Sequence, residues 1–190
     1  MKRFAVLAGI LALAAPLAFA QASTWVSDPN HSEVDFAITH MSIAKVHGRF
    51  GNVNATIQYD PADATKASVN VTIDVSTVDT GVSARDNDLK GPNYFDVADF
   101  PKATYTSTGV TKNGSHLTVN GNLTLHGVTK PVTLDVDTIS PPITAHGKVH
   151  TGFSATATIS RTDFGIAPKA PATMLGDEVQ LIIELDAIKQ

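Results

Sequence analysis

The chain has 190 residues, 43% of them hydrophobic and 17% charged, and a formal net charge of −4. This composition is typical of one globular domain and excludes a disordered or collagen-like chain. Cysteine is absent, which excludes disulfides, thiolate nucleophiles and cysteine-bound metals. The acidic balance argues against nucleic acid as a partner, because phosphate binding depends on clustered Lys and Arg.

Residues 1–20 have the layout of an export signal. Lys2 and Arg3 precede an apolar run over residues 4–17, and Ala18-Phe19-Ala20 gives the small-x-small pattern that signal peptidase cleaves. A retained membrane anchor is the alternative, but the run is marginal in length for a membrane-spanning helix and contains Pro16. We therefore expect cleavage after Ala20, a periplasmic protein without a stable membrane anchor, and a single domain over residues 21–190.

Apolar and polar residues alternate with a period of two through the mature chain, which predicts strands with one buried and one wet face. About eight strands fit this pattern, separated by turn signals at Asp60-Pro61, Asn113-Gly114 and Pro141-Pro142. Asn113-Gly114 predicts a hairpin, because both residues tolerate φ > 0. The alternating segments are 34–38, 53–59, 69–75, 117–119, 123–125, 132–136, 153–159 and 179–185.

The longest interval between predicted strands runs from Ser83 to Pro101. Ser83-Ala84-Arg85-Asp86 is similar to a capping box with Asp in place of Glu, and Gly91-Pro92 is a stop signal. We expect a short helix from Ala84 to Lys90. After it, Tyr94, Phe95 and Phe100 bring three aromatic rings into a loop that an ordinary sheet connection would not need. Helix and loop together predict a lid over an apolar space.

Eight antiparallel strands can form a sandwich or close into a barrel, and periodicity alone does not decide between them. The small residues Gly121, Ala155 and Ala157 fall on inward positions of the alternation. They would leave voids in a tightly packed sandwich but room for a guest inside a barrel. The sequence therefore favours an all-β fold, an eight-stranded antiparallel lipocalin-like barrel with the short helix and aromatic loop as its lid.

The sequence predicts no metal site, no cofactor and no catalytic residue. Seven histidines are present, but none forms an H-E-x-x-H or H-x-H cluster. His31 lies close to Asp28-Pro29, which predicts a hydrogen-bonded turn before the first long strand. There is no G-x-S-x-G nucleophile motif, and loop acids on an acidic surface are usually solvated.

Two pairs of cations offer a place for a polar head group: Arg85 and Lys90 on the expected lid helix, and Lys45 and Arg49 in the turn-rich stretch after the first predicted strand. Any of them could neutralise an anionic head at the barrel mouth. The alternative for Arg85 is an ion pair with Asp86 or Asp88 that holds the lid in place.

Four longer motifs extend from Trp25 to the C-terminal region. They are Trp25-x-x-Asp28-Pro29-x-His31-Ser32-x-Val34-x-Phe36 with His40-Met41; Arg85-Asp86-x-x-Leu89-Lys90 with Phe95-Asp96-Val97 and Phe100-Pro101; Gly121-x-Leu123-Thr124-x-x-Gly127-Val128-Thr129-Lys130-Pro131-Val132; and Arg161-x-Asp163-Phe164-Gly165 with Gly176-Asp177-Glu178-Val179. Together they resemble the YceI-like family of exported lipid-binding or polyisoprenoid-binding proteins. The resemblance implies a lipocalin-like barrel whose elongated cavity holds a long-chain isoprenoid or similar lipid. In two lid positions where the family commonly has His and Ser, this chain has Asp88 and Gly91.

These observations predict a non-enzymatic protein that binds, stores or transports a polyisoprenoid or similar long-chain apolar ligand in the periplasm. Two other hypotheses stay open: an enzyme that acts on a small lipid-like molecule inside the barrel, and a filled barrel that serves as a protein-interaction domain. A homodimer also stays open. The residues expected to contact the ligand lie on inward strand positions and in the lid: Phe36, Ile38, Val71, Ile73, Arg85, Leu89, Tyr94, Phe95, Phe100, Leu125, Leu134, Ala155 and Ala157.

Overall fold

The computed structural model describes residues 22–190, so the predicted export signal lies outside the described residues. Within this range, eleven strands form one sheet, accompanied by one α-helix and three short 3-10 helices. The strands are β1 (Ser23–Ser27), β2 (Glu33–His40), β3 (Ala44–Phe50), β4 (Val53–Tyr59), β5 (Ser68–Asp74), β6 (Lys102–Asn113), β7 (His116–Leu125), β8 (Val128–Ile139), β9 (Ile143–Ala145), β10 (Lys148–Ser160) and β11 (Leu175–Lys189). The helices are η1 (Ala64–Lys66), η2 (Val75–Thr77), α1 (Ser83–Leu89) and η3 (Thr162–Phe164).

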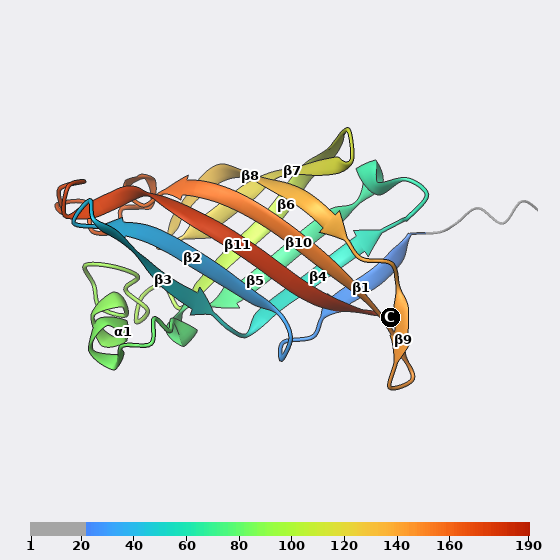
Figure 1. Cartoon of the computed structure of the whole chain (residues 1–190), viewed down its shortest axis with the longest axis horizontal. Helices are drawn as coiled ribbons and strands as arrows, with labels where there is room; N and C mark the ends of the chain where they lie inside the picture. Colours follow the sequence, from blue (N-terminus) through green and yellow to red (C-terminus); the bar gives the residue numbers. More distant parts are fainter. Residues whose placement is uncertain (1–21) are drawn as a thin grey trace, which may run out of the picture.

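The sheet closes on itself as an eight-stranded antiparallel barrel (Figure 1). The ring runs β11-β1-β4-β5-β6-β7-β8-β10, and pairing between β10 and β11 closes it. One part of the long β11 pairs with β2, and its last residues pair with β1. The first two strands of the chain therefore lie end to end along one edge of β11, and β3 extends the wall beside β2. The predicted barrel is confirmed.

Strand alternation sets which side chains fill the barrel. On β4, Val53, Ala55 and Ile57 are almost fully buried, whereas Asn54 and Thr56 between them are exposed. The inward row supplies the main stabilisation, because a fully buried Val or Ile side chain contributes about 1.5–3 kcal/mol. The outward row of Thr, Asn and Asp suits a pleated surface in contact with water.

The lid closes one end of the barrel, at the left in Figure 1. α1 begins at Ser83, one residue before the predicted start, and the predicted capping box is wrong. Ser83 lies within the first turn and makes no side-chain cap, since Val82 holds the cap position. The Asp86 carboxylate instead accepts the backbone N–H of Thr80 at 2.8 Å and the Thr80 hydroxyl at 2.6 Å. Asp86 thus joins the helix to the segment before it.

The hairpin predicted at Asn113-Gly114 is confirmed in a slightly different register. The β6–β7 ladder continues to the pair Asn113↔His116, which leaves Gly114 and Ser115 as the turn. Gly114 has φ +63°, which glycine adopts without steric cost, while Asn113 remains in the strand. This hairpin projects at the end of the barrel opposite the lid (Figure 1).

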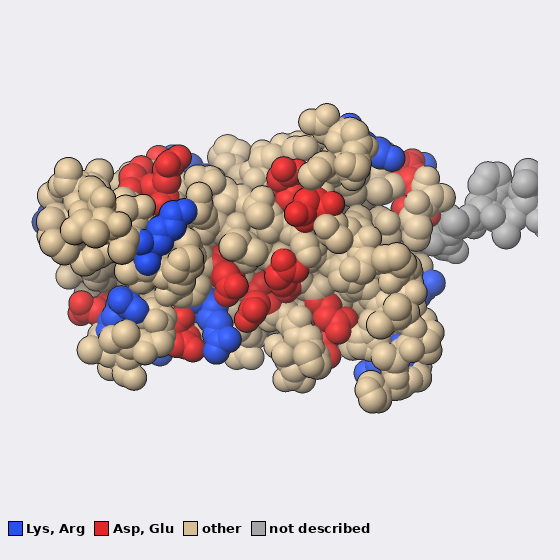
Figure 2. Space-filling model, in the orientation of Figure 1, with Lys and Arg blue, Asp and Glu red and all other residues tan. Residues whose placement is uncertain are grey.

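The outer surface carries the charged side chains. Glu33 and Asp35 on β2 lie next to Glu184 on β11, with Asp186 further along the same strand. Figure 2 shows acidic side chains along the middle of the face on which β2 and β11 lie. In the part of the chain that the structure describes, no helix has both the length and the apolar character needed to cross a membrane.

Candidate functional site

The barrel encloses an apolar cavity of about 100 Å³ beneath the lid, here named the lid-end cavity. Leu89 of α1 and Tyr94 and Phe95 of the following loop form its lid side. Phe95 packs edge-on against Phe50, with 5.4 Å between ring centroids. The remaining lining residues are Phe36, Ile38, Phe50, Leu125, Ile159, Leu175, Val179 and Leu181 of the strands, Arg161 at the start of η3 and Ile166 after it.

A second apolar cavity, of about 70 Å³, lies further along the barrel and is here named the open-end cavity. β11 passes along both spaces, since Leu181 lines the first and Ile183 the second. The lining residues are apolar except for the phenol of Tyr59: Ile57, Tyr59, Ala67, Val69, Val71, Val110, Leu117, Val119, Leu134, Val136, Ile139, Phe153, Ala155, Ile183 and Leu185. The two cavities therefore follow each other along the barrel axis.

In the part of the chain that the structure describes, two small apolar cavities follow each other where the family resemblance implies a single elongated one. Gly121 was expected to leave room for a guest, but the Tyr105 side chain occupies that room. A Cβ built on Gly121 would lie 2.4 Å from Cζ of Tyr105. The Tyr105 hydroxyl lies 3.0 Å from the carbonyl oxygen of Val119 and 3.2 Å from that of Val132, so its proton is donated to the backbone. Burial raises the pKa of Tyr105 to about 12, because the phenolate cannot be solvated there.

The residues predicted to contact a ligand divide into three groups. Six of them line the lid-end cavity: Phe36, Ile38, Leu89, Tyr94, Phe95 and Leu125. Three line the open-end cavity: Val71, Leu134 and Ala155. The other four, Ile73, Arg85, Phe100 and Ala157, line neither cavity.

Each of these four has a local explanation. Ile73 packs against the buried residues of both core clusters. Phe100 stacks edge-on against His126, with 4.9 Å between ring centroids. Ala157 lies on the inward row, one residue beyond the last paired position between β8 and β10, Asp135↔Thr156.

The Arg85 side chain turns away from the cavity. Its Nε donates to the Thr80 hydroxyl at 2.7 Å and its Nη2 to the Thr80 carbonyl at 3.0 Å. The alternative of an ion pair with Asp86 or Asp88 is not formed among the described residues, since the guanidinium donates to Thr80 instead. Arg49 likewise points to the outside, where it pairs with Asp79 at 3.3 Å.

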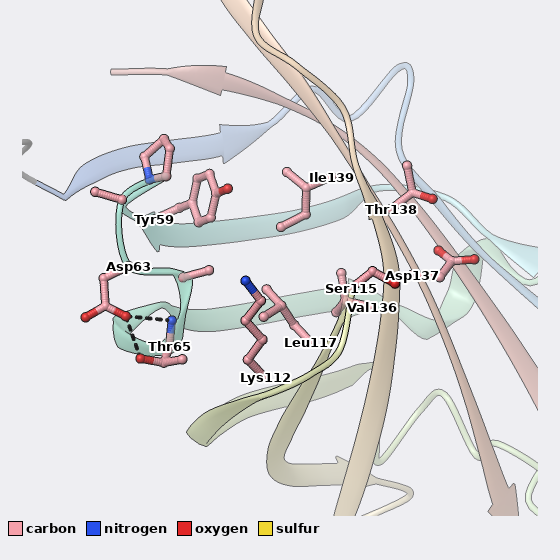
Figure 3. Close-up of a pocket in the computed structure, with 13 residues that line it drawn as sticks. Tyr59, Asp63, Thr65, Lys112, Ser115, Leu117, Val136, Asp137, Thr138 and Ile139 are labelled. Atoms are coloured by element: carbon pink, nitrogen blue, oxygen red, sulfur yellow. Dashed lines mark hydrogen bonds between the residues drawn. The ribbon is translucent and has the colours of Figure 1, made fainter.

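A polar pocket of about 550 Å³ opens at the end of the barrel opposite the lid (Figure 3). We name it the mouth. It shares Tyr59, Leu117, Val136 and Ile139 with the open-end cavity, so the apolar interior leads into it. Figure 3 shows Lys112 beside Leu117, with Asp63 and Thr65 on one side of the pocket and Asp137 and Thr138 on the other. Sequence reasoning expected the polar end near the lid, and the structure places a polar pocket at the opposite end.

Charges at the mouth are partly paired. Asp63 accepts the Thr65 hydroxyl at 2.6 Å and pairs with Lys66 at 2.8 Å, and these contacts lower the pKa of Asp63. Among the described residues, Lys112 forms no ion pair. Burial raises the pKa of Tyr59, so its phenol remains protonated and can donate a hydrogen bond.

Arg161 also lines the lid-end cavity, although the sequence did not predict it as a ligand contact. It is only 3% exposed, and its guanidinium donates to five backbone carbonyls. These carbonyls belong to Ile166, Ala167, Ala170, Leu175 and Gly176, so Arg161 fixes the loop that completes the lid-end wall. A buried Arg with all donors satisfied holds a loop without needing a counter-ion.

Comparison with known proteins places this architecture among its relatives. A model of the YceI-like domain matches residues 25–187. Protein YceI of Salmonella newport is 39% identical over 161 residues, which cover 84% of this chain and 83% of that protein. The crystal structure of Burkholderia cenocepacia BcnA superposes with a TM-score of 0.74 at 26% identity, covering 84% of this chain and 98% of that one. A polyisoprenoid-binding domain from Saccharophagus degradans shares the fold, with a TM-score of 0.61 at 16% identity. The match covers 90% of this chain and 100% of that domain. The chain therefore belongs to the YceI-like family.

Proposed function

We propose that this protein binds the chain of a polyisoprenoid or similar lipid inside its barrel and carries or stores it in the periplasm without chemical change. The observation that carries this proposal is the pair of apolar cavities that follow each other through the barrel and open into the polar mouth. Cavities lined by apolar side chains stay dry and accept apolar guests. The fold that this chain shares with a polyisoprenoid-binding domain supports the same ligand class.

The energy of chain burial is sufficient for such binding. Each buried methylene contributes about 0.8 kcal/mol, and association costs at least about 4 kcal/mol in lost freedom. A chain of roughly ten carbons therefore offsets the cost of association. Affinity then depends mainly on chain length, and the mouth selects the head group.

A long chain needs more space than the two cavities provide. They measure about 100 and 70 Å³, and an apolar cavity of about 150 Å³ holds no more than a molecule the size of benzene. Binding therefore requires the side chains between the cavities to change rotamer and join the two spaces. Ile73 packs against the buried residues of both core clusters, so it is one side chain that would have to move.

The mouth suits a polar head that remains in contact with water. Lys112 supplies a cation, and Thr65, Ser115 and Thr138 supply hydroxyl groups that can both donate and accept hydrogen bonds. A retained head would lie here, and its chain would enter past Tyr59 and Leu117.

An enzymatic role would need a base or nucleophile in the interior. The titrating groups with shifted pKa values at the interior are Tyr59 and Tyr105, and both shifts are upward. A phenol with a raised pKa is a poor base at neutral pH. We therefore favour binding without catalysis.

The test combines ligand identification with a pair of matched variants. Native mass spectrometry of the purified protein, followed by organic extraction, should reveal an apolar guest, and the stripped protein should bind farnesol or geranylgeraniol. Ala155→Leu places a larger side chain in the open-end cavity and should abolish binding, while Thr156→Leu puts the same side chain on the outer face and should not. Binding that is absent in the wild type, or lost equally in both variants, would refute the proposal.

Export is a separate part of the proposal. The intact mass of the protein recovered from a periplasmic fraction should correspond to a chain that begins at Gln21. Recovery of the full-length chain from the cytoplasm alone would contradict it.

A further inference from the structure

Four side chains with metal-ligating atoms meet on the outer face of the barrel, at the turn between β1 and β2. Asp28 and His31 belong to this turn, His150 to β10 and Asp186 to β11. Ligating atoms of Asp28, His31 and Asp186 lie within 4.8 Å of one another. Nδ1 of His150 lies 2.8 Å from Oδ1 of Asp186. Residues that are far apart in the sequence thus form one cluster, which is separate from the interior cavities and the mouth.

The backbone holds this cluster in place. The N–H of Asp28 donates to the carbonyl of Asp186 at 2.7 Å, which fastens the turn to β11. The Ser32 hydroxyl donates to the same carbonyl and accepts the N–H of Asp186, both at 3.2 Å. The N–H of Asn30 donates to Oδ1 of Asp28 at 3.0 Å and orients that carboxylate. Side chains positioned in advance by the fold lose little entropy when they bind an ion.

The surroundings attract a cation. Two carboxylates lie close together, and the Asp28 and Asp186 side chains are only 18% and 31% exposed, so water screens their repulsion incompletely. Glu184 and Glu33, which pair across β11 and β2, add negative charge on the same outer face. A cleft lined by one sign of charge raises the local concentration of counter-ions.

The donor set selects the kind of cation. Two imidazoles with two carboxylates suit Zn²⁺, which binds His nitrogen and Asp oxygen at about 2.0–2.2 Å, usually with four ligands. Mg²⁺ and Ca²⁺ prefer oxygen ligands throughout. Two ligands on one tetrahedral Zn²⁺ are roughly 3.3 Å apart. Ligating atoms of Asp28, His31 and Asp186 lie within 4.8 Å of one another, so small side-chain movements bring them to that spacing, and His150 reaches the group through Asp186, 2.8 Å away.

We propose that Asp28, His31, His150 and Asp186 form a Zn²⁺ site on the outer face of the barrel. The ion would replace any proton shared within each His–Asp pair and tie the β1–β2 turn to β10 and β11. Because β10 and β11 close the barrel, the bound ion would stabilise the closure.

The direct test is zinc binding by the untagged chain after treatment with EDTA. Isothermal titration calorimetry and equilibrium dialysis should show one saturable Zn²⁺ per chain and little binding of Mg²⁺. Zn²⁺ should also raise the melting temperature. The absence of a saturable site for Zn²⁺ would overturn the proposal.

Matched histidine variants decide whether this cluster is the site. The double variant His31→Ala/His150→Ala should lower Zn²⁺ affinity by at least about 100-fold, since it removes both nitrogen ligands. His116→Ala is the control, because His116 also faces a carboxylate, Asp135 at 3.6 Å, but lies outside the cluster. Unchanged Zn²⁺ binding in the double variant, or an equal loss in the control, would overturn the proposal.

Circular dichroism should show that all variants fold as the wild type does. Both variants should retain farnesol binding, since neither alters a cavity wall. The outcome for zinc is therefore independent of the outcome for the apolar ligand.

Discussion

Phe95 and Phe100 provide a sharp test of the lid, because both are half-buried rings in the same loop but only Phe95 lines a cavity. Removing a buried Phe side chain forfeits about 1.5–3 kcal/mol of transfer free energy. Phe95 also loses an edge-on contact with Phe50, and Phe100 one with His126, each contributing about 0.5–1.5 kcal/mol. Because both rings are partly exposed, we expect Phe95→Ala and Phe100→Ala each to lower the free energy of unfolding by about 2–3 kcal/mol.

The two variants should differ in ligand binding. Phe95→Ala removes part of the wall over the lid-end cavity, so its affinity for farnesol should fall by about tenfold or more, equivalent to about 1.4 kcal/mol. Phe100→Ala leaves that wall intact and should keep an affinity within about threefold of the wild type. Urea unfolding measures stability, and titration calorimetry with farnesol measures affinity.

The comparison at equal stability decides the outcome. If Phe100→Ala loses as much affinity as Phe95→Ala, ligand loss follows from general destabilisation and the lid has no specific role. If neither variant loses affinity, the ligand does not enter the lid-end cavity.

Three further predictions concern single groups. Gly121→Ala should lower stability by about 2–3 kcal/mol in urea unfolding, because the new Cβ would lie 2.4 Å from the Tyr105 ring and 2.7 Å from a backbone oxygen; a change below about 0.5 kcal/mol would contradict the packing described. Asp177→Asn should destabilise by about 1 kcal/mol at neutral pH, because hydrogen bonds from Ser160 and Thr162 and the nearby charge of Arg161 lower the pKa of Asp177. Because the pKa of Asp177 is lower in the folded than in the unfolded state, its contribution to stability is present above the unfolded-state pKa and is lost as pH falls through the native pKa. The free energies of unfolding of the wild type and Asp177→Asn should therefore converge in acid. A difference between them that stays constant with pH would exclude this origin. Ultraviolet titration should show a phenol that ionises near pH 12 in the wild type and is missing in Tyr105→Phe.

The sequence by itself determined the lid and most of the barrel strands. Alternation missed β1, β3, β6 and β9, and the predicted segments 117–119 and 123–125 are parts of the single strand β7. Alternation over residues 53–59 predicts an inward row of Val53, Ala55 and Ile57, and these side chains are buried. The break in alternation after Ser83 predicts the short helix and its aromatic loop. Both signals are local, since side-chain direction along a strand and helix propensity depend on near neighbours in the chain.

Neighbours across the barrel depend on strand register, which alternation does not specify. The sequence shows Gly121 as a small inward residue but not that Tyr105 fills the space beside it from the neighbouring strand. It predicts inward positions for Ala155 and Ala157, yet of the two only Ala155 lines the open-end cavity, while Ala157 is partly buried against the core. A period of two gives the face of each residue and leaves its partners open.

Tertiary structure alone decided the location of the polar groups. The mouth combines Asp63, Lys112 and Asp137 from segments far apart in the chain, at the end opposite the lid helix. The turn containing Asp28 and His31 is a local signal and was predicted, but its approach to Asp186 depends on the pairing of β1 and β2 with successive parts of β11. Contacts of this range arise only when the sheet closes, since closure brings together strands that the sequence separates by most of its length.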